Sequence, residues 1–322
     1  MGVTPSSGLA KRVVVLAVAL VATAPADAEP FAYITNQKDN SVSVIDTATG
    51  DVIKTLPVGI EPAGIAVSRD GSTICVTNPT GKSVTIIDGH SNTVVGDIPV
   101  GEGPVGIAVD AKGRYAYVAD WYDHRLSLLD LQHKVVVWWI PVGHSPAGVV
   151  ISPEGSKVYV ANRDDDSISE IDVRALAVTR TVKVGKHPFG IALSADGRRL
   201  YSANVESNDV SVVDTAAMQV VKTIPVGERP YAVAPTQDRL FVTNQYENTV
   251  SVIDAGQLNV IGSIEVGEYP EGISVHPDGI HVYVANWFSN DVSVVDARTL
   301  KLEKTIQTGN GSRAFGEFIA QN

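Results

Sequence analysis

The sequence has very little cysteine: Cys75 is the only one in 322 residues. A single thiol excludes an internal disulfide, and it excludes a metal or iron–sulfur centre built on several cysteines. The covalent staples of small secreted domains are therefore missing. The fold must be stabilised by buried apolar area instead.

Catalytic motifs are also missing. The chain has no Walker loop, no GxSxG, no HExxH and no CxxC. These absences exclude P-loop nucleotide hydrolysis, the α/β-hydrolase nucleophile elbow, zincin-type proteolysis and thioredoxin-type redox chemistry. The formal net charge of −11 also argues against nucleic acid or an anionic membrane as a partner.

No apolar run is long enough to span a bilayer, because the longest near the start covers only residues 13–22. That run follows Lys11 and Arg12 and precedes Ala26-Asp27-Ala28, a small-x-small cleavage pattern. We predict that residues 1–28 are a signal peptide cut near Ala28. The mature domain, residues 29–322, is then expected to be periplasmic or secreted, without membrane insertion.

One unit recurs seven times, as in the stretches YITNQKDNSVSVID from Tyr33 and YVANWFSNDVSVVD from Tyr283. The stretches end at Asp46, Asp88, Asp130, Asp172, Asp214, Asp254 and Asp296, which gives a period of 42 residues with one step of 40. Each unit holds four short apolar runs with period-2 alternation, separated by turn residues. A period near 40 with four strands per unit predicts an all-β fold, a seven-bladed β-propeller of four-stranded antiparallel blades.

The two ends of the chain fit a closed ring. The mature chain starts in the second strand of a unit, and the tail SRAFGEFI, residues 312–319, fits the missing first strand. We therefore expect the C-terminal strand to complete blade 1 and to remove the open sheet edges. In such a ring the first strand of each blade lines the channel, and the loops entering it share one face with the loops between strands two and three.

The repeat separates structural residues from candidates for function. Asn36 and its six counterparts share one position, and the aspartates that end the stretches share another, so we interpret both as Asx caps of turns. The same reasoning argues against a glycosidase with paired carboxylates. Cys75 occupies the position of Tyr or Phe in the other units and is interpreted as a core residue.

The blocks YVTN, VSVID and PVGxxPxGIAVSxDG, with the AFGEFI tail, resemble the YVTN-repeat (YncE-like) β-propeller family over the whole mature chain. The resemblance implies a seven-bladed propeller, often exported, in a superfamily that includes quinoprotein amine dehydrogenase chains and the propeller of nitrous oxide reductase. It implies no single activity, because its motifs build blades. The tryptophan-rich repeats of quinone-binding dehydrogenase propellers are missing, so no cofactor is predicted. Blade 6 departs from the pattern, since residues 230–241 lack the usual glycine and are two residues short.

The residues that the repeat does not require lie mostly where the channel-entry face is expected. We predict a ligand- or partner-binding surface there, made of His144, His187, Phe189, Arg229, Tyr231, Tyr269, Glu271, Arg313 and the double aromatics Trp121, Tyr122, Trp287 and Phe288. Three histidines on this face, His124, His144 and His187, would form a metal site only if they converged. Their positions in the repeat unit are expected to lie at different depths below the entry face, so the three side chains should not converge. We therefore expect no stoichiometric transition metal.

Two functions stay open. The first is a non-enzymatic exported scaffold that binds a periplasmic protein or a small molecule, accessory to a quinoprotein or cytochrome oxidation system. The second is a lactonase or lyase at the channel mouth, for which Glu271, His187, Arg229 and Tyr231 would be the working set. No catalytic residue is assigned, because the accessory role rests on family analogy and the second function on residue types alone.

Overall fold

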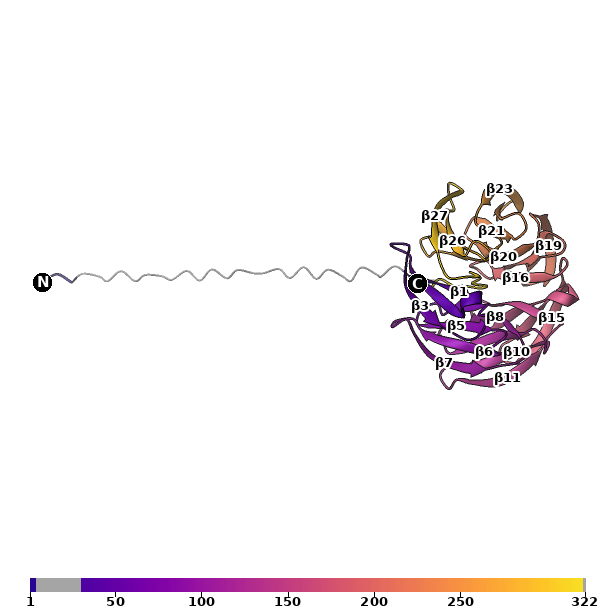
Figure 1. Ribbon diagram of the computed structural model, residues 1–322, viewed down its shortest axis with the longest axis horizontal. Coiled ribbons are helices and arrows are strands. Elements are labelled where there is room, and N and C mark those ends of the chain that lie inside the picture. Colours follow the sequence, from indigo (N-terminus) through magenta and orange to yellow (C-terminus); the bar gives the residue numbers. More distant parts are fainter. Residues whose placement is uncertain (4–29, 321–322) are drawn as a thin grey trace.

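The computed structural model describes residues 1–3 and 30–320. These residues form 27 β-strands in seven antiparallel sheets, arranged around a central channel as the ring in Figure 1. The predicted seven-bladed propeller is confirmed. Residues 4–28 of the predicted signal peptide lie outside the described residues. In the described ranges, no helix has both the length and the hydropathy to cross a membrane.

The blades follow one another along the chain, and blades 2 to 7 each run from an inner to an outer strand. Blade 1 contains β1 (Phe31–Asn36), β2 (Ser41–Asp46) and β3 (Asp51–Pro57), with a 3-10 turn η1 (Gln37–Asp39). Blades 2 to 4 contain β4 (Ile65–Val67), β5 (Thr73–Asn78), β6 (Ser83–Asp88), β7 (Thr93–Pro99); β8 (Pro104–Val109), β9 (Tyr115–Asp120), β10 (Arg125–Asp130), β11 (Val135–Pro141); and β12 (Pro146–Ile151), β13 (Lys157–Asn162), η2 (Arg163–Asp165), β14 (Ser167–Asp172), β15 (Ala177–Lys183). Blades 5 to 7 contain β16 (Pro188–Leu193), β17 (Arg199–Asn204), β18 (Asp209–Asp214), β19 (Gln219–Pro225); β20 (Pro230–Pro235), β21 (Arg239–Asn244), β22 (Thr249–Asp254), β23 (Asn259–Glu265); and β24 (Pro270–Val275), β25 (His281–Asn286), β26 (Asp291–Asp296), β27 (Lys301–Gln307).

Burial follows the position of a strand within its blade. The second and third strands are buried almost throughout, because neighbouring blades cover both of their faces, as in β5 and β6. The outer strands are mostly exposed, as in β19. The core therefore lies between the blades, and each blade is stabilised mainly by its two neighbours.

The two repeated Asx positions have different roles. Asp46 Oδ1 accepts hydrogen bonds from the backbone N–H groups of Ala48 and Thr49, at 2.9 and 3.3 Å, which confirms this aspartate as a turn cap. Asn36 is fully buried and donates instead to the hydroxyls of Ser41 and Ser43, at 3.0 and 2.9 Å. Asn36 Oδ1 accepts from the backbone N–H of Gly309 at 3.1 Å, and Asn162 Oδ1 accepts from that of Gly143 at 2.9 Å. The asparagines therefore satisfy a backbone donor, as predicted, but in an entry loop and not in their own turn, and they also tie the second strand of a blade to the third.

The C-terminal tail takes the inner place of blade 1, as predicted, but through isolated bridges instead of a continuous ladder. The N–H of Tyr33 donates to the carbonyl of Phe318 at 3.0 Å, and the N–H of Ile65 donates to the carbonyl of Phe315 at 2.9 Å. The tail thus bonds to blade 1 on one side and to blade 2 on the other. Gly316 has φ +124°, and a Cβ there would lie 2.3 Å from the carbonyl oxygen of Ile65. Glycine is needed at this close approach.

The inner strands lie close together around the channel. In Figure 1, β8, β16 and β20 lie near the centre of the ring, and β7, β11, β15, β19 and β23 lie at its rim. A Cβ on Gly106 would lie 1.9 Å from the carbonyl oxygen of Ala147 in the next blade, so this glycine permits the contact between blades. Blade 6 has Ala232 at the equivalent position, and β20 still pairs with β21. The departure of blade 6 from the repeat is therefore local.

Candidate binding face at the channel mouth

Two loops of each blade lie together at the channel entry. The backbone N–H of Trp121 donates to Gly103 O at 3.0 Å, and the N–H of Trp287 donates to Tyr269 O at 3.0 Å. Equivalent bonds join Val205 to His187 and Gln245 to Arg229. The entry loops and the loops between strands two and three therefore share one face, as expected. The residues predicted for the binding surface all lie on or directly below this face.

An aromatic plug, defined here as Trp121, Phe189, Tyr231 and Phe315, fills the channel mouth. The ring centroid of Phe189 lies 4.4 Å from that of Tyr231, 4.8 Å from that of Phe315 and 6.1 Å from that of Trp121. Phe189, Tyr231 and Phe315 are buried, whereas Trp121 is half-buried. The plug brings together blades 3, 5 and 6 and the tail, so its rings support the surface instead of forming it.

A buried polar network lies beside the plug. Arg313 Nε lies 2.7 Å from Glu271 Oε2, and Arg313 Nη2 donates to the hydroxyl of Tyr231 at 2.6 Å. Gln245 Nε2 donates to Glu271 Oε1 at 3.0 Å. The charged groups of Arg313 and Glu271 therefore form a buried ion pair below the surface.

The protonation of this network is set by burial and by the ion pair. Burial raises the pKa of Glu271, and the nearby guanidinium of Arg313 offsets part of that effect. Burial alone would lower the pKa of Arg313, but the Glu271 carboxylate raises it above its ordinary value. Burial also raises the pKa of the Tyr231 hydroxyl. Arg313 is thus always charged, and neither Tyr231 nor Glu271 is available as a solvent-facing base near neutral pH.

A second group of rings lies at the surface of blades 6 and 7. We call it the aromatic patch: Tyr246, Tyr269, Trp287 and Phe288. Tyr269 is central, with its ring centroid 5.9 Å from Tyr246, 5.9 Å from Trp287 and 4.9 Å from Phe288. Tyr246 and Phe288 are 57% and 51% exposed. The patch is therefore a continuous apolar surface that water reaches.

Cations and hydrogen bonds fix the rings of the patch. Lys38 Nζ lies 4.1 Å from the centroid of the Trp287 ring, and Arg229 Cζ lies 4.9 Å from the centroid of the Tyr246 ring. Trp287 Nε1 donates to Gln37 Oε1 in blade 1 at 2.9 Å. These contacts hold the rings in place in the free protein. The patch is preorganised for binding.

The double aromatic of blade 3 is arranged differently. Tyr122 is 70% exposed, whereas Trp121 turns toward the plug, with Arg163 Cζ 5.6 Å from its ring centroid. The two double aromatics of the predicted surface therefore differ in their surroundings. Trp121 belongs to the plug, and Tyr122 stands alone at the surface.

The three entry-face histidines do not form one cluster. The rings of His124 and His144 lie 4.8 Å apart, and His144 Nδ1 lies 2.8 Å from Asp165 Oδ1. His187 Nε2 instead lies 3.5 Å from Glu206 Oε2. The structure thus brings together His124 and His144 and engages His187 within its own blade.

The four residues weighed as a catalytic set are also separated by their partners. Tyr231 and Glu271 are joined through Arg313 in the buried network. Arg229 lies against the ring of Tyr246 and His187 lies beside Glu206, so the two belong to other contacts. The set shares one face but does not form one acid–base constellation.

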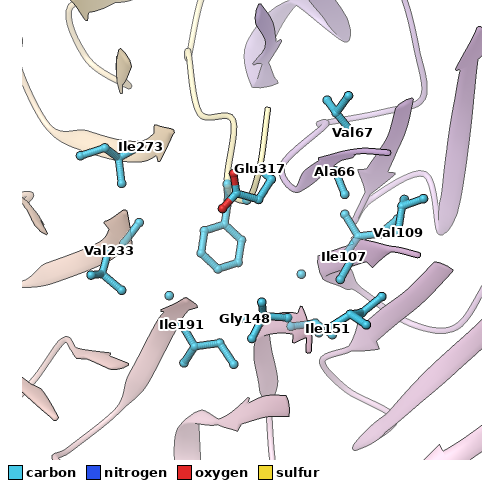
Figure 2. Close-up of a pocket in the computed structure, with 18 residues that line it drawn as sticks. Ala66, Val67, Ile107, Val109, Gly148, Ile151, Ile191, Val233, Ile273 and Glu317 are labelled. Atoms are coloured by element: carbon cyan, nitrogen blue, oxygen red, sulfur yellow. The ribbon is translucent and has the colours of Figure 1, made fainter. Parts of the chain in front are cut away.

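Below the plug, the inner strands enclose a cavity of about 170 Å³. Its walls are apolar, and Glu317 is the one charged side chain among the described residues that line it. In Figure 2 its carboxyl group points into the centre, between Ile273 and Val233 on one side and Ile107 on the other. Ser274 Oγ donates to Glu317 Oε2 at 3.3 Å. Channel water reaches this carboxyl, but the surrounding protein raises its pKa.

Several residues of this face were not predicted from the sequence. Phe315 and Glu317 belong to the tail AFGEFI, which was interpreted from the sequence only as a strand of blade 1. Their position at the channel was therefore not predicted. Gln245 and Tyr246 stand at the same position as Trp287 and Phe288, and this shared position was the signal that they also lie on the face. Lys38 gave no signal, because its contact with Trp287 exists only where the ring closes.

Comparisons with known proteins agree with the fold. The model of the YNCE-like β-propeller family matches residues 9–112, and the model of the 7-bladed β-propeller lactonases matches residues 99–223. The chain is thus a seven-bladed propeller, and its resemblance to YncE-like propellers is confirmed. No curated protein matches the sequence.

Solved structures share the fold at low identity. Hydrazine synthase of Kuenenia stuttgartiensis is similar with a TM-score of 0.74 at 21% identity, over 88% of this chain and 99% of that one. A functionally unknown protein from Desulfotomaculum acetoxidans gives 0.77 at 14% identity, over 89% and 99%. The dihydro-heme d1 dehydrogenase NirN, solved in complex with DHE, gives 0.68 at 19% identity, over 89% of this chain and 66% of that one. At these identities the similarity concerns the fold alone.

Proposed function

We propose that this protein is a non-enzymatic binding scaffold whose aromatic patch docks a protein partner. The observation that carries the proposal is the patch itself, four neighbouring rings of which Tyr246 and Phe288 are more than half exposed. The repeat does not require aromatics at these positions, since blade 1 has Gln37-Lys38 and blade 2 has Pro79-Thr80 there. Exposed aromatics beside a cation are typical of interface hot spots.

The arrangement of the acidic and basic groups supports binding over catalysis. A general acid or base must reach a substrate and exchange protons with it. Glu271 is 5% exposed and faces Arg313, and Tyr231 is 5% exposed below the surface. The polar network therefore acts as a rigid floor under the face.

We further propose that the protein works outside the cytoplasm, beside a redox system of the quinoprotein or cytochrome type. The predicted signal peptide supports the location. The fold supports the setting by analogy, since NirN is a dihydro-heme d1 dehydrogenase and hydrazine synthase is also an enzyme of this fold class. In this setting the protein would hold a partner and carry no cofactor of its own.

The test is a capture experiment with a matched control. A tagged full-length chain is expressed in its own host, crosslinked and purified, and the bound proteins are identified by mass spectrometry. We expect one partner to be recovered with the wild type and lost with Trp287→Ser/Phe288→Ser. The control is Trp138→Ser/Trp139→Ser, a tryptophan pair 53% and 54% exposed on the outer strand β11, which should retain the partner.

Stability must be measured on the same variants. The patch variant is expected to melt below the wild type, because Trp287 is half-buried and its replacement loses the hydrogen bond to Gln37. A substitution confined to the exposed part of the patch should cost only about 0.5 kcal/mol or less. Phe288→Ser alone checks this, since Phe288 is the more exposed of the two. Unchanged capture, or a drop of about 10 °C or more in Tm for Phe288→Ser, would refute a docking role for the patch.

A lactonase is the second candidate, because the lactonase family model matches residues 99–223. Its site would lie at the channel mouth, with Glu271 as the acidic group. Hydrolysis of a panel of sugar and acyl lactones, followed by proton release, tests it directly. Turnover that is lost in Glu271→Gln but retained in Trp287→Ser/Phe288→Ser would favour the enzyme over the scaffold.

A further inference from the structure

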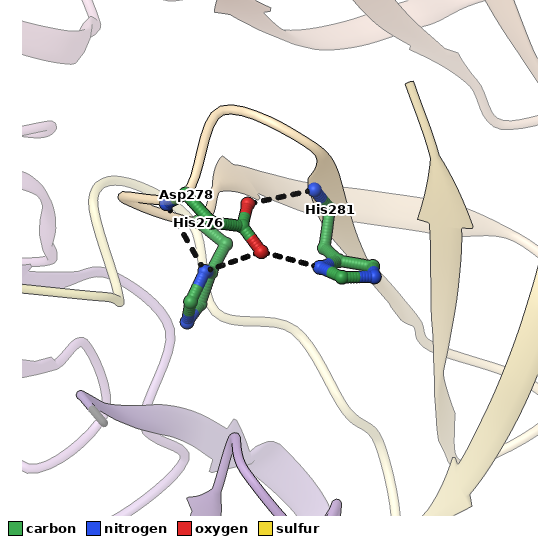
Figure 3. Close-up of side chains that lie close together, drawn as sticks. All are labelled: His276, Asp278 and His281. Carbon is green, nitrogen blue, oxygen red and sulfur yellow. Dashed lines mark hydrogen bonds and ion pairs between the residues drawn. The ribbon is translucent and has the colours of Figure 1, made fainter. Parts of the chain in front are cut away.

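Two histidines and two carboxylates meet in blade 7, at the opposite end of β24 from the channel entry. His276 and Asp278 lie in the turn after β24, His281 begins β25, and Glu303 lies on β27. Figure 3 shows the two imidazole rings on either side of the Asp278 carboxylate. Asp278 Oδ2 lies 3.1 Å from His276 Nδ1 and 2.5 Å from His281 Nδ1. One ligand atom from each of the three residues lies within 4.8 Å of the others.

The repeat does not require this combination. Asp278 belongs to the blade frame, because Asp70 and Asp196 occupy the same turn position. His276 stands where other blades have Ser68, Ser152 or Ser194; His281 where they have Thr73, Tyr115, Lys157 or Arg199; and Glu303 where they have Ile53, Val95, Val137, Thr179, Val221 or Ile261. Two histidines foreign to the frame thus meet one frame carboxylate, and Glu303, also foreign to the frame, contacts the second histidine. Their convergence calls for an explanation other than blade construction.

Second contacts orient both rings. Thr47 donates its hydroxyl hydrogen to the carbonyl of Pro30, so its oxygen accepts from His276 Nε2–H at 3.2 Å. Glu303 Oε2 lies 3.2 Å from His281 Nε2, an ion-pair contact on the side of the ring that faces away from Asp278. The Nδ1 atoms of both rings face Asp278: that of His276 accepts from the Asp278 backbone N–H at 3.3 Å, and that of His281 lies against the carboxylate. In metal sites, an oxygen that contacts the second nitrogen of a histidine ring orients the ring and leaves the first nitrogen to bind the metal.

A cation is needed between these atoms. A neutral Nδ1 and a carboxylate oxygen both present lone pairs, and at 2.5 Å they repel each other unless a proton or a metal ion lies between them. A tetrahedral ion with bonds of about 2.0–2.1 Å holds its ligand atoms roughly 3.3 Å apart. The separations from Asp278 Oδ2 are 3.1 Å and 2.5 Å, and the three ligand atoms lie within 4.8 Å of one another, so side-chain shifts of less than about 1 Å for the Asp278 contacts would bring them to that value. A hollow of about 340 Å³, lined by these residues and by Thr47–Gly50, leaves room for a water as a further ligand.

We propose that His276, Asp278 and His281 bind a divalent transition metal ion of the zinc type, with Glu303 and Thr47 as the groups that orient the histidines. Two imidazole nitrogens and one carboxylate suit zinc and its neighbours in the first transition series. The site lies where blade 7 meets blade 1, since Thr47 and Gly50 belong to blade 1. A bound ion would therefore reinforce the junction at which the ring closes. The expectation of no transition metal considered only the entry-face histidines and did not include this pair.

The experiment titrates the full-length, metal-stripped chain with ZnCl₂ alone by isothermal calorimetry. We expect one equivalent to bind and the Tm to rise with zinc, because an ion that binds the folded state stabilises it by mass action. His281→Thr should lose the binding without loss of fold, because Thr73 fills the same position in blade 2. Glu303→Val, which copies Val95, should weaken binding about 10- to 100-fold, as loss of a ligand's orienting partner does.

The matched control is His133→Ala. His133 Nδ1 also lies 3.0 Å from a carboxylate, that of Asp130, but it has no second histidine in that contact. This variant should bind zinc as the wild type does. Absence of a one-to-one zinc isotherm would overturn the proposal and leave a protonated His281 between two carboxylates. So would zinc binding that His281→Thr does not change, because the ion would then lie elsewhere on the surface.

Discussion

Removal of the C-terminal tail, residues 312–322, should unfold the propeller. Phe315, Phe318 and Ile319 are at most 4% exposed. Loss of such side chains costs about 3–5 kcal/mol for each Phe and 2–5 kcal/mol for Ile, which gives roughly 8–15 kcal/mol together. The whole stability of a domain is about 5–15 kcal/mol. The truncated chain also exposes backbone N–H groups of Tyr33 and Ile65 that the tail satisfies.

A single substitution measures the same effect without abolishing the fold. Phe318 is fully buried between blades 1, 2 and 7, so Phe318→Ala should lower the free energy of unfolding by about 3–5 kcal/mol. At about 2–4 °C per kcal/mol, the Tm should fall by roughly 10 °C. Both quantities are measured by circular dichroism, with heat and with urea.

The control is Val221→Ala on β19, where the side chain is 55% exposed and the change should cost about 0.5 kcal/mol or less. A soluble truncation with the Tm of the wild type would refute closure by the tail. Equal stability of Phe318→Ala and Val221→Ala would refute the packing argument.

Two further predictions concern ionisable groups inside the ring. The Glu317 side chain is exposed to the channel, but desolvation by the channel walls raises its pKa, so its neutral form favours the folded state, and stability falls as pH rises above about 4.5, the ordinary Glu value. Glu317→Gln should therefore have a higher Tm than the wild type at pH 8 and the same Tm near pH 4, and a constant difference across this range would contradict the assignment. Burial also raises the pKa of the fully buried Cys75 thiol, so a disulfide reagent should leave the native protein unlabelled and should label one thiol per chain in guanidinium, whereas rapid labelling of the native protein would show that the thiol is accessible.

The fold was predictable because each blade repeats the same pattern of strands and turns. The turn residues and the period-2 alternation recur at a spacing of 42 residues. A strand that is assigned wrongly in one unit can therefore be corrected by comparison with the other six. The tail could be placed because exactly one strand was missing. The prediction for the asparagines was right in part: Asn36 accepts a backbone N–H, but from Gly309 in an entry loop, and it also bonds to serines on the neighbouring strand. One-dimensional spacing does not distinguish these contacts from a cap of the residue's own turn.

The candidate surface was predictable only as a list of residues on one face. Comparison of the units identified Trp287, Phe288 and Tyr269 as foreign to the frame, and the structure places these three rings together. The same comparison did not show that Tyr231 and Glu271 lie below the surface. Burial depends on the neighbouring blade and on Arg313 of the tail, which is 42 residues beyond Glu271 in the sequence.

By itself the sequence determined the all-β class, the number of blades and the closure of the ring, because these depend on the pattern within one unit, on the number of its copies and on the one strand that the first copy lacks. Only the tertiary structure decided which singular residues meet. Lys38 reaches Trp287, and Thr47 reaches His276, across the junction of the first and last blades, more than 200 residues apart in the chain. Ring closure creates these contacts. Whether two side chains interact there depends on distances of a few ångströms, which cannot be derived from the spacing of the repeats.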